Sequence, residues 1–147
     1  MTTEDRTMRT SRILPFSPAK IYGAFASPDL LAAWWGPEGF RNTFEVFEFK
    51  VGGRWKFVMH GPDGKNYPNE SVFVQLEPDS KVVIEHVCAP YFTLTVQLVP
   101  VPDGTRLSWE QVFADAKTAQ AVKQIVEPAN EQNLDRMTQV LANESAT

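Results

Sequence analysis

The sequence is poor in several residues on which large classes of protein depend. Its 147 residues include a single cysteine, Cys88, so no disulfide forms within the chain and a cysteine-based zinc site is not expected. The two histidines, His60 and His86, lack the spacing of a helical metal-binding pair. No phosphate-binding helix is expected after Gly52-Gly53, which argues against a nucleotide. We therefore expect neither a metal nor another cofactor.

Basic charge and long apolar runs are also scarce. Lysines and arginines number 14 against 18 aspartates and glutamates, and the net charge of −4 argues against a nucleic-acid partner, which usually requires a basic face. The apolar stretches are strand-sized and interrupted by charge, far short of the roughly 20 residues that span a bilayer. We expect no integral membrane contact and, because the N-terminus does not resemble a signal peptide, a cytoplasmic location.

The residues that are present fit a single domain. The chain is close to the commonest domain size, and its hydrophobic content of 43% is ordinary for a protein with a core. No repeat or linker divides residues 1–147. At this size a chain buries roughly two-thirds of its unfolded surface, so a core alone can hold the fold together.

Two helix-start signals occur in the first third of the chain. Ser17-Pro18 and Ser27-Pro28 each place a capping serine before a proline, which suits the first turn of a helix. They predict short helices over 19–25 and 30–35. The second helix must end at Gly36-Pro37, because proline disfavours helical geometry in the residue before it.

Seven segments alternate with a period of two and are rich in β-branched and aromatic residues, which predicts strands. The predicted strands are 8–14, 41–50, 54–60, 69–77, 81–87, 91–101 and 104–113. Short turns join the last six, which indicates an antiparallel meander in a sheet of about seven strands. Alternation places Trp55, Phe57 and Met59 on one apolar face, and Arg54 and Lys56 on the opposite face.

Residues 116–142 have the spacing of a long amphipathic helix. Its apolar stripe consists of Val122, Ile125, Val126, Ala129, Leu134, Met137, Val140 and Leu141. The only large partner for this stripe is the apolar face of the sheet, so the helix should lie across that face. Pro128 predicts a kink, a break or a second helical start, because it removes a backbone donor and crowds the carbonyl of Gln124.

This order of elements resembles the helix-grip fold of the START-like (SRPBCC) superfamily. Five segments are similar to the branch named for the activator of the heat-shock-protein-90 ATPase, and they are Pro15–Tyr22, Ser27–Pro37, Glu48–Trp55, Asp103–Leu107 and Asn133–Met137. They cover nearly the whole chain in the family's order, and Ser27–Pro37 is the most distinctive. The chain departs from the branch at Ala129-Asn130, where the branch commonly has Gly-Trp.

The resemblance implies an α+β, helix-grip (START/Bet v-like) fold. In such a fold a curved antiparallel sheet, two short helices and a long C-terminal helix enclose an apolar cavity. The superfamily includes lipid and hormone binders, polyketide cyclases and cochaperone-like domains, so the fold by itself does not choose among these functions.

The candidate ligand-binding residues are the side chains expected to face that cavity. The apolar candidates are Trp34, Trp35, Trp55, Phe57, Met59, Phe92, Leu94, Trp109 and Met137. The polar candidates are His86, Gln111, Asn130 and Asn133, which fall on the inward face. A buried polar group without a partner costs about 1–3 kcal/mol, so each of these must meet a side chain, a water or a ligand.

The adjacent Trp34 and Trp35 are not expected to point into the same core. They could plug the space between helix and sheet, or form the lip of a cavity or a partner surface.

Three functions remain open. We favour noncatalytic binding of a small hydrophobic or amphipathic molecule. An alternative is an enzyme of the cyclase or dehydratase type that uses His86 as a proton shuttle, because the unperturbed pKa of histidine is nearest to neutral. A third is a module that binds a chaperone, or a second copy of itself, through a surface including Trp34 and Trp35. No catalytic residue is assigned, because Ser108 falls on the outward face and no nucleophile-elbow spacing occurs.

Overall fold

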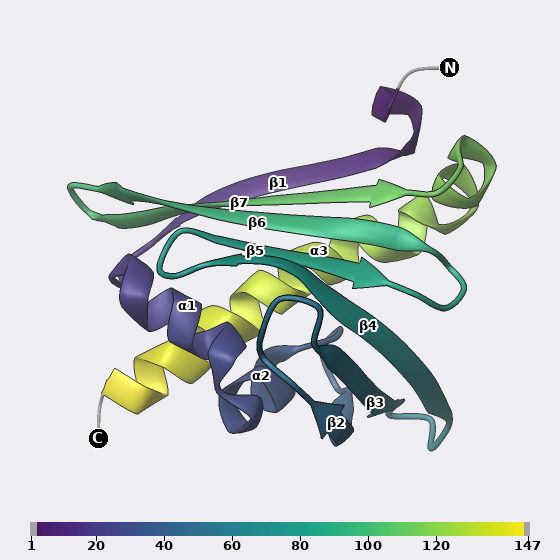
Figure 1. The fold of residues 1–147 in the computed structure, drawn as a ribbon, viewed down its shortest axis with the longest axis horizontal. Coiled ribbons are helices and arrows are strands. Elements are labelled where there is room, and N and C mark those ends of the chain that lie inside the picture. Colours follow the sequence, from purple (N-terminus) through teal and green to yellow (C-terminus); the bar gives the residue numbers. More distant parts are fainter. Residues whose placement is uncertain (1–2, 146–147) are drawn as a thin grey trace.

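A computed structural model of the protein describes residues 3–145, which form one seven-stranded sheet and three α-helices (Figure 1). The elements in chain order are a 3-10 helix η1 (Thr3–Arg6), β1 (Thr7–Leu14), α1 (Pro18–Ala26), α2 (Pro28–Trp34), β2 (Arg41–Phe47), β3 (Arg54–His60), β4 (Asn66–Glu77), β5 (Lys81–His86), β6 (Phe92–Val101), β7 (Gly104–Phe113) and α3 (Ala116–Ser145). The predicted α+β class and the order of its strands and α-helices are confirmed, whereas η1 was not predicted.

The strands are hydrogen-bonded in the order β1-β7-β6-β5-β4-β3-β2, with every pair antiparallel. The strands β2 to β7 are therefore the predicted meander, and β1 adds to the edge formed by β7. Two boundaries differ by three residues, because β2 ends at Phe47 and not at residue 50, and β4 begins at Asn66 and includes Pro68. At Pro68 the strand β4 pairs only with β3, since its pairing with β5 starts at Ser71. A proline without a donor is tolerated there, as on an edge strand.

The serine caps predicted for α1 and α2 are present. The Oγ of Ser17 accepts a hydrogen bond from the N–H of Lys20 at 3.2 Å, and the Oγ of Ser27 accepts from that of Leu30 at 3.4 Å. The helix α2 ends at Trp34, and Trp35 has an extended backbone with φ −70° and ψ 135°.

The helix α3 crosses one face of the sheet, and α1 and α2 pack beside it (Figure 1). Its residues Leu134, Met137 and Leu141 are fully buried in the same core as the inner face of the sheet, as predicted, whereas Ile125, assigned to the same stripe, is 72% exposed. Of the alternatives predicted at Pro128, the break and the second helical start are wrong, because α3 is one continuous element, whereas the kink stays a prediction. Proline has no N–H to donate to the carbonyl of Gln124. Pro128 and Gln124 are both exposed, so this unpaired carbonyl does not belong to a buried residue.

The core is dominated by aromatic rings, and the expectation for the adjacent tryptophans is wrong. Trp34 is fully buried and Trp35 is half-buried, yet both rings contact that of Trp109, with centroids 6.4 and 6.1 Å away. The cause is the end of α2 between the two residues. Because Trp35 is extended, its side chain does not follow the helical rotation that would separate it from Trp34.

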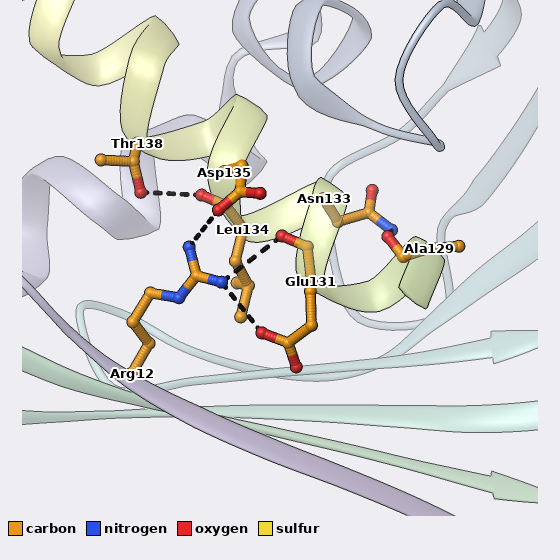
Figure 2. A network of polar contacts seen from close by, with 7 residues as sticks. All are labelled: Arg12, Ala129, Glu131, Asn133, Leu134, Asp135 and Thr138. Atoms are coloured by element: carbon orange, nitrogen blue, oxygen red, sulfur yellow. Dashed lines mark hydrogen bonds and ion pairs between the residues drawn. The ribbon is translucent and has the colours of Figure 1, made fainter. Parts of the chain in front are cut away.

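A polar contact on the outside ties β1 to α3 (Figure 2). The guanidinium of Arg12 lies between two carboxylates of α3, 2.7 Å from Asp135 and 2.9 Å from Glu131. Such partly exposed pairs contribute little individually, although one arginine shared by two acids fixes the lateral position of the helix. The opposite side of α3, which carries Asn133, faces the interior described next.

Candidate binding cavity

A cavity of about 220 Å³ lies between α3, the segment that follows α2, and the inner face of the sheet. It is lined by Trp35, Gly36, Pro37, Phe57, Met59, Asn69, His86, Pro90, Phe92, Leu94, Trp109, Gln111, Val126, Ala129, Asn130 and Asn133. Rings and aliphatic groups make up most of this wall. No aspartate, glutamate, lysine or arginine is among the described residues that line it.

Ten of the thirteen candidate residues line the cavity, and these are Trp35, Phe57, Met59, His86, Phe92, Leu94, Trp109, Gln111, Asn130 and Asn133. The other three, Trp34, Trp55 and Met137, are fully buried in the core outside the lining. The indole N–H of Trp34 donates to the carbonyl of Ala24 at 2.9 Å, which holds this ring against α1. A role of the ten residues in binding stays a prediction.

Six lining residues were not among the candidates, namely Gly36, Pro37, Asn69, Pro90, Val126 and Ala129. Asn69 is opposite Phe57 in the ladder between β3 and β4, so the two side chains share a face. The observed pairing with Phe57 could have identified Asn69. The predicted strand, however, starts only at residue 69, three residues after the true start, so its bounds do not predict this pairing. Gly36, Pro37 and Pro90 belong to connections, where strand and helix periodicity gives no orientation.

The segment after α2 is held against α3 by two side chains. Asn133 accepts the backbone N–H of Gly36 at 2.7 Å. Arg136 donates to five carbonyl oxygens at 2.8 to 3.1 Å, those of Ala33, Trp35, Gly36, Pro37 and Phe40. Burial lowers the pKa of Arg136, and the nearby Glu38 opposes this shift. Arg136 belongs to the segment Asn133–Met137 that is similar to the family, but no local pattern in the sequence predicts this role.

The backbone conformation of Gly36 is the main reason for a glycine at this position. Its φ of +96° lies in the left-handed region, and a Cβ would stand 2.7 Å from the Cε of Met59, another lining residue. The wall of the cavity therefore approaches the backbone of this segment closely.

Among the described residues that line the cavity, His86 is the only one with a titratable side chain. Its Nδ1 is 2.7 Å from the carbonyl oxygen of Pro90, its Nε2 is 2.8 Å from the Oδ1 of Asn69, and its ring stacks on Phe92 with centroids 4.6 Å apart. The Sγ of Cys88 lies 3.5 Å from the same Nε2. Burial lowers the pKa of His86, and the hydrogen bonds to the backbone of Pro90 and Cys88 oppose this shift without outweighing it.

Of the remaining polar residues, Gln111 and Asn130 connect the sheet to α3. The amide nitrogen of Asn130 donates to the Oε1 of Gln111 at 3.0 Å, and both residues are buried. Asn133 also donates to the carbonyl of Ala129 at 3.1 Å. Each of the four polar candidates therefore has at least one partner within the protein.

Two other features limit where a site can lie. A larger hollow of about 450 Å³ between β1 and α3 is lined partly by charged side chains, including Arg9, Lys123, Glu127 and Glu131, and shares Asn130 with the cavity. Within residues 3–145 no three histidine, cysteine, aspartate or glutamate side chains are grouped as a metal site would need.

Among the described helices, none combines the length and the apolar character needed to cross a membrane.

A bent antiparallel sheet that closes around an internal space under a long C-terminal helix defines the helix-grip class. The chain belongs to the family described as activator of Hsp90 ATPase homolog 1-like protein, whose sequence model matches residues 15–142. This confirms the resemblance of the sequence. The family indicates a ligand-binding or chaperone-associated module.

Solved structures show the same fold. A protein of Nitrosomonas europaea is 18% identical with a TM-score of 0.89, the alignment covering 97% of this chain and 98% of that one. One from Arthrobacter aurescens is 22% identical with a TM-score of 0.88, over 97% and 90% of the two chains. One from Rhodobacter sphaeroides is 26% identical with a TM-score of 0.84, over 95% and 93%. No curated protein matches the chain.

Proposed function

We propose that this protein binds a small, predominantly apolar molecule in the cavity beneath α3, without catalysing a reaction. The observation that supports this most is the composition of the wall, which combines rings such as Trp35, Phe57 and Phe92 with a few buried amides. Apolar walls with a small number of oriented polar groups are characteristic of small-molecule sites.

The volume sets the size of the guest. Cavities of roughly 150 Å³ hold benzene, and sites for drug-sized ligands have roughly 300–1,000 Å³. A cavity of about 220 Å³ lies between these limits. It suits a single substituted ring, and it is too small for an intact lipid or a polyketide chain.

The arrangement around His86 supports binding over proton transfer. Both ring nitrogens already lie within hydrogen-bond distance of oxygen atoms of the protein, those of Pro90 and Asn69. A general acid or base must reach the proton of its substrate, so His86 would first have to leave these partners.

The affinity should be modest. A ring that buries roughly 150 Å² of apolar surface gains about 4 kcal/mol at 25 cal/mol per Å², which corresponds to a dissociation constant of roughly 1 mM. Binding is therefore best measured by ligand-observed NMR with toluene at millimolar concentration.

Ala129→Leu tests the location, because Ala129 lies on the cavity side of α3 and a larger side chain would occupy the space. We expect this variant to lose at least tenfold in toluene affinity. Ala121→Leu is the matched control, since it makes the same change at an exposed position of the same helix. If the two variants bind toluene equally, the site lies elsewhere. If neither the wild type nor the control variant binds toluene saturably, the proposed function is refuted.

The family description supports a second candidate, association with the chaperone Hsp90. The surface first considered for it changes, however, because Trp34 is fully buried and Trp35 is half-buried under α3. Co-precipitation of the folded protein with purified Hsp90, with and without toluene, distinguishes the candidates. Capture that is independent of toluene and unaffected by Ala129→Leu would favour the chaperone-associated role.

A further inference from the structure

The pair formed by Gln111 and Asn130 has two polar atoms that no group of the described protein satisfies. The exposed fractions of these residues are only 7% and 6%, and both line the cavity. Their mutual hydrogen bond uses the Oε1 of Gln111 and the Nδ2 of Asn130. Within residues 3–145, no group of the protein accepts from the Nε2 of Gln111 or donates to the Oδ1 of Asn130.

This leaves one donor and one acceptor next to each other in an otherwise apolar enclosure. Neither atom is among the fully buried side-chain atoms without a partner, so water can solvate both in the empty cavity. A guest that satisfies both atoms replaces that water without losing hydrogen bonds, whereas an apolar guest leaves them unsatisfied at a cost of about 1–3 kcal/mol.

The charge of the lining restricts the guest further. Its described residues include no acid, lysine or arginine, and burial favours the neutral form of its one histidine, His86. A carboxylate, phosphate or ammonium group would therefore be buried without a counter-charge, at a cost that exceeds the gain from burying one ring.

We propose that the cavity selects an uncharged, ring-sized molecule that carries a carboxamide or lactam group. This rests on the proposed binding function. The carbonyl oxygen of the guest accepts from the Nε2 of Gln111, and its N–H donates to the Oδ1 of Asn130. A ketone would satisfy only Gln111, and a carboxylate would place a second acceptor against the Oδ1 of Asn130.

Four compounds of similar shape test this on the wild-type protein, namely benzamide, benzoate, benzylamine and toluene. Binding is measured by NMR titration at pH 7.5. We expect benzamide to bind about tenfold more tightly than toluene, and benzoate and benzylamine to bind at least tenfold more weakly than benzamide.

Gln111→Met tests the residue, since it removes the amide while nearly keeping the length and volume of the side chain. We expect benzamide to fall to the affinity of toluene, whose own binding stays within about twofold. Gln97→Met is the matched control, because Gln97 is exposed on the outward face of β6. Amide chemical-shift dispersion checks that both variants are folded. If Gln111→Met does not fold, the comparison of the four compounds on the wild-type protein still tests the ligand class.

Each outcome has one meaning. If toluene and benzamide bind wild type equally, or if benzoate or benzylamine binds as well as benzamide, the selection for a carboxamide is wrong while the apolar cavity stands. If Gln111→Met keeps the preference for benzamide, the assignment to Gln111 is wrong. If none of the four compounds binds, the proposed function itself fails.

Discussion

At the scale of single residues, His86 makes the stability of the protein depend on pH. Its pKa is lowered by burial in the folded state, whereas an unfolded histidine titrates near 6.5. Below that pH the unfolded chain binds a proton that the folded chain does not, so the free energy of unfolding falls as the pH falls. The slope that one group can add is at most about 1.4 kcal/mol per pH unit.

We expect His86→Gln to remove this contribution, so that it loses less stability than wild type between pH 7.5 and 5.5 in urea unfolding. His60→Gln is the control, because it removes the other histidine and leaves His86 in place. An unchanged pH dependence in His86→Gln, with a reduced one in His60→Gln, would contradict the assignment.

Arg136 should matter for stability through its geometry as well as its charge. Its guanidinium donates to five carbonyl oxygens around the end of α2, a pattern that a planar fork can make and an ammonium cannot. We expect Arg136→Lys to lower the free energy of unfolding by about 2 kcal/mol in urea titrations. Arg106→Lys, at an exposed position on β7, should change it by less than about 0.5 kcal/mol. Equal effects of the two substitutions would show that Arg136 acts only as a positive charge.

At the scale of elements, Pro128 costs α3 part of its stability. It lies inside a continuous helix, where proline removes one backbone hydrogen bond and costs roughly 3 kcal/mol relative to alanine. We expect Pro128→Ala to raise the free energy of unfolding by about 1–3 kcal/mol, measured by chemical denaturation. Glu127→Ala controls for a general gain from alanine on an exposed face. A decrease in stability for Pro128→Ala would mean that the proline is matched to a bend that the sheet requires.

The elements also show what a sequence can and cannot reveal. Periodicity identified all seven strands, and the capping serines located α1 and α2, because both signals are local. Errors arose where tertiary context decides. The strand β4 starts early because Pro68 has a neighbour on one side only, and Trp35 turns inward because α2 stops before it.

The site shows the same contrast between what local patterns predict and what tertiary context decides. Parity along strands and the stripe of α3 located side chains such as Leu94, Gln111 and Asn133, which lie inside regular elements. Trp55 has the same parity as Phe57, yet only Phe57 lines the cavity, since other rings of the core cover Trp55. Which inward residues meet free space depends on how the sheet bends under α3, and alternation carries no information about bending.

At the scale of the whole molecule, the proposed function requires one physical property of the fold. The space between α3 and the sheet must accept a ring without rearrangement of the fold. Family membership and fold are compatible with this claim but do not establish it, because the same architecture serves several functions.

The most direct measurement is a two-dimensional amide NMR titration of the wild-type protein with toluene. We predict saturable shifts concentrated in residues around the cavity, on β6, β7 and the middle of α3, among them Leu94, Gln111 and Ala129. Residues at the far turn between β6 and β7, such as Asp103, should stay unchanged. Shifts that cluster instead along the charged hollow between β1 and α3, or that do not saturate, would contradict the claim.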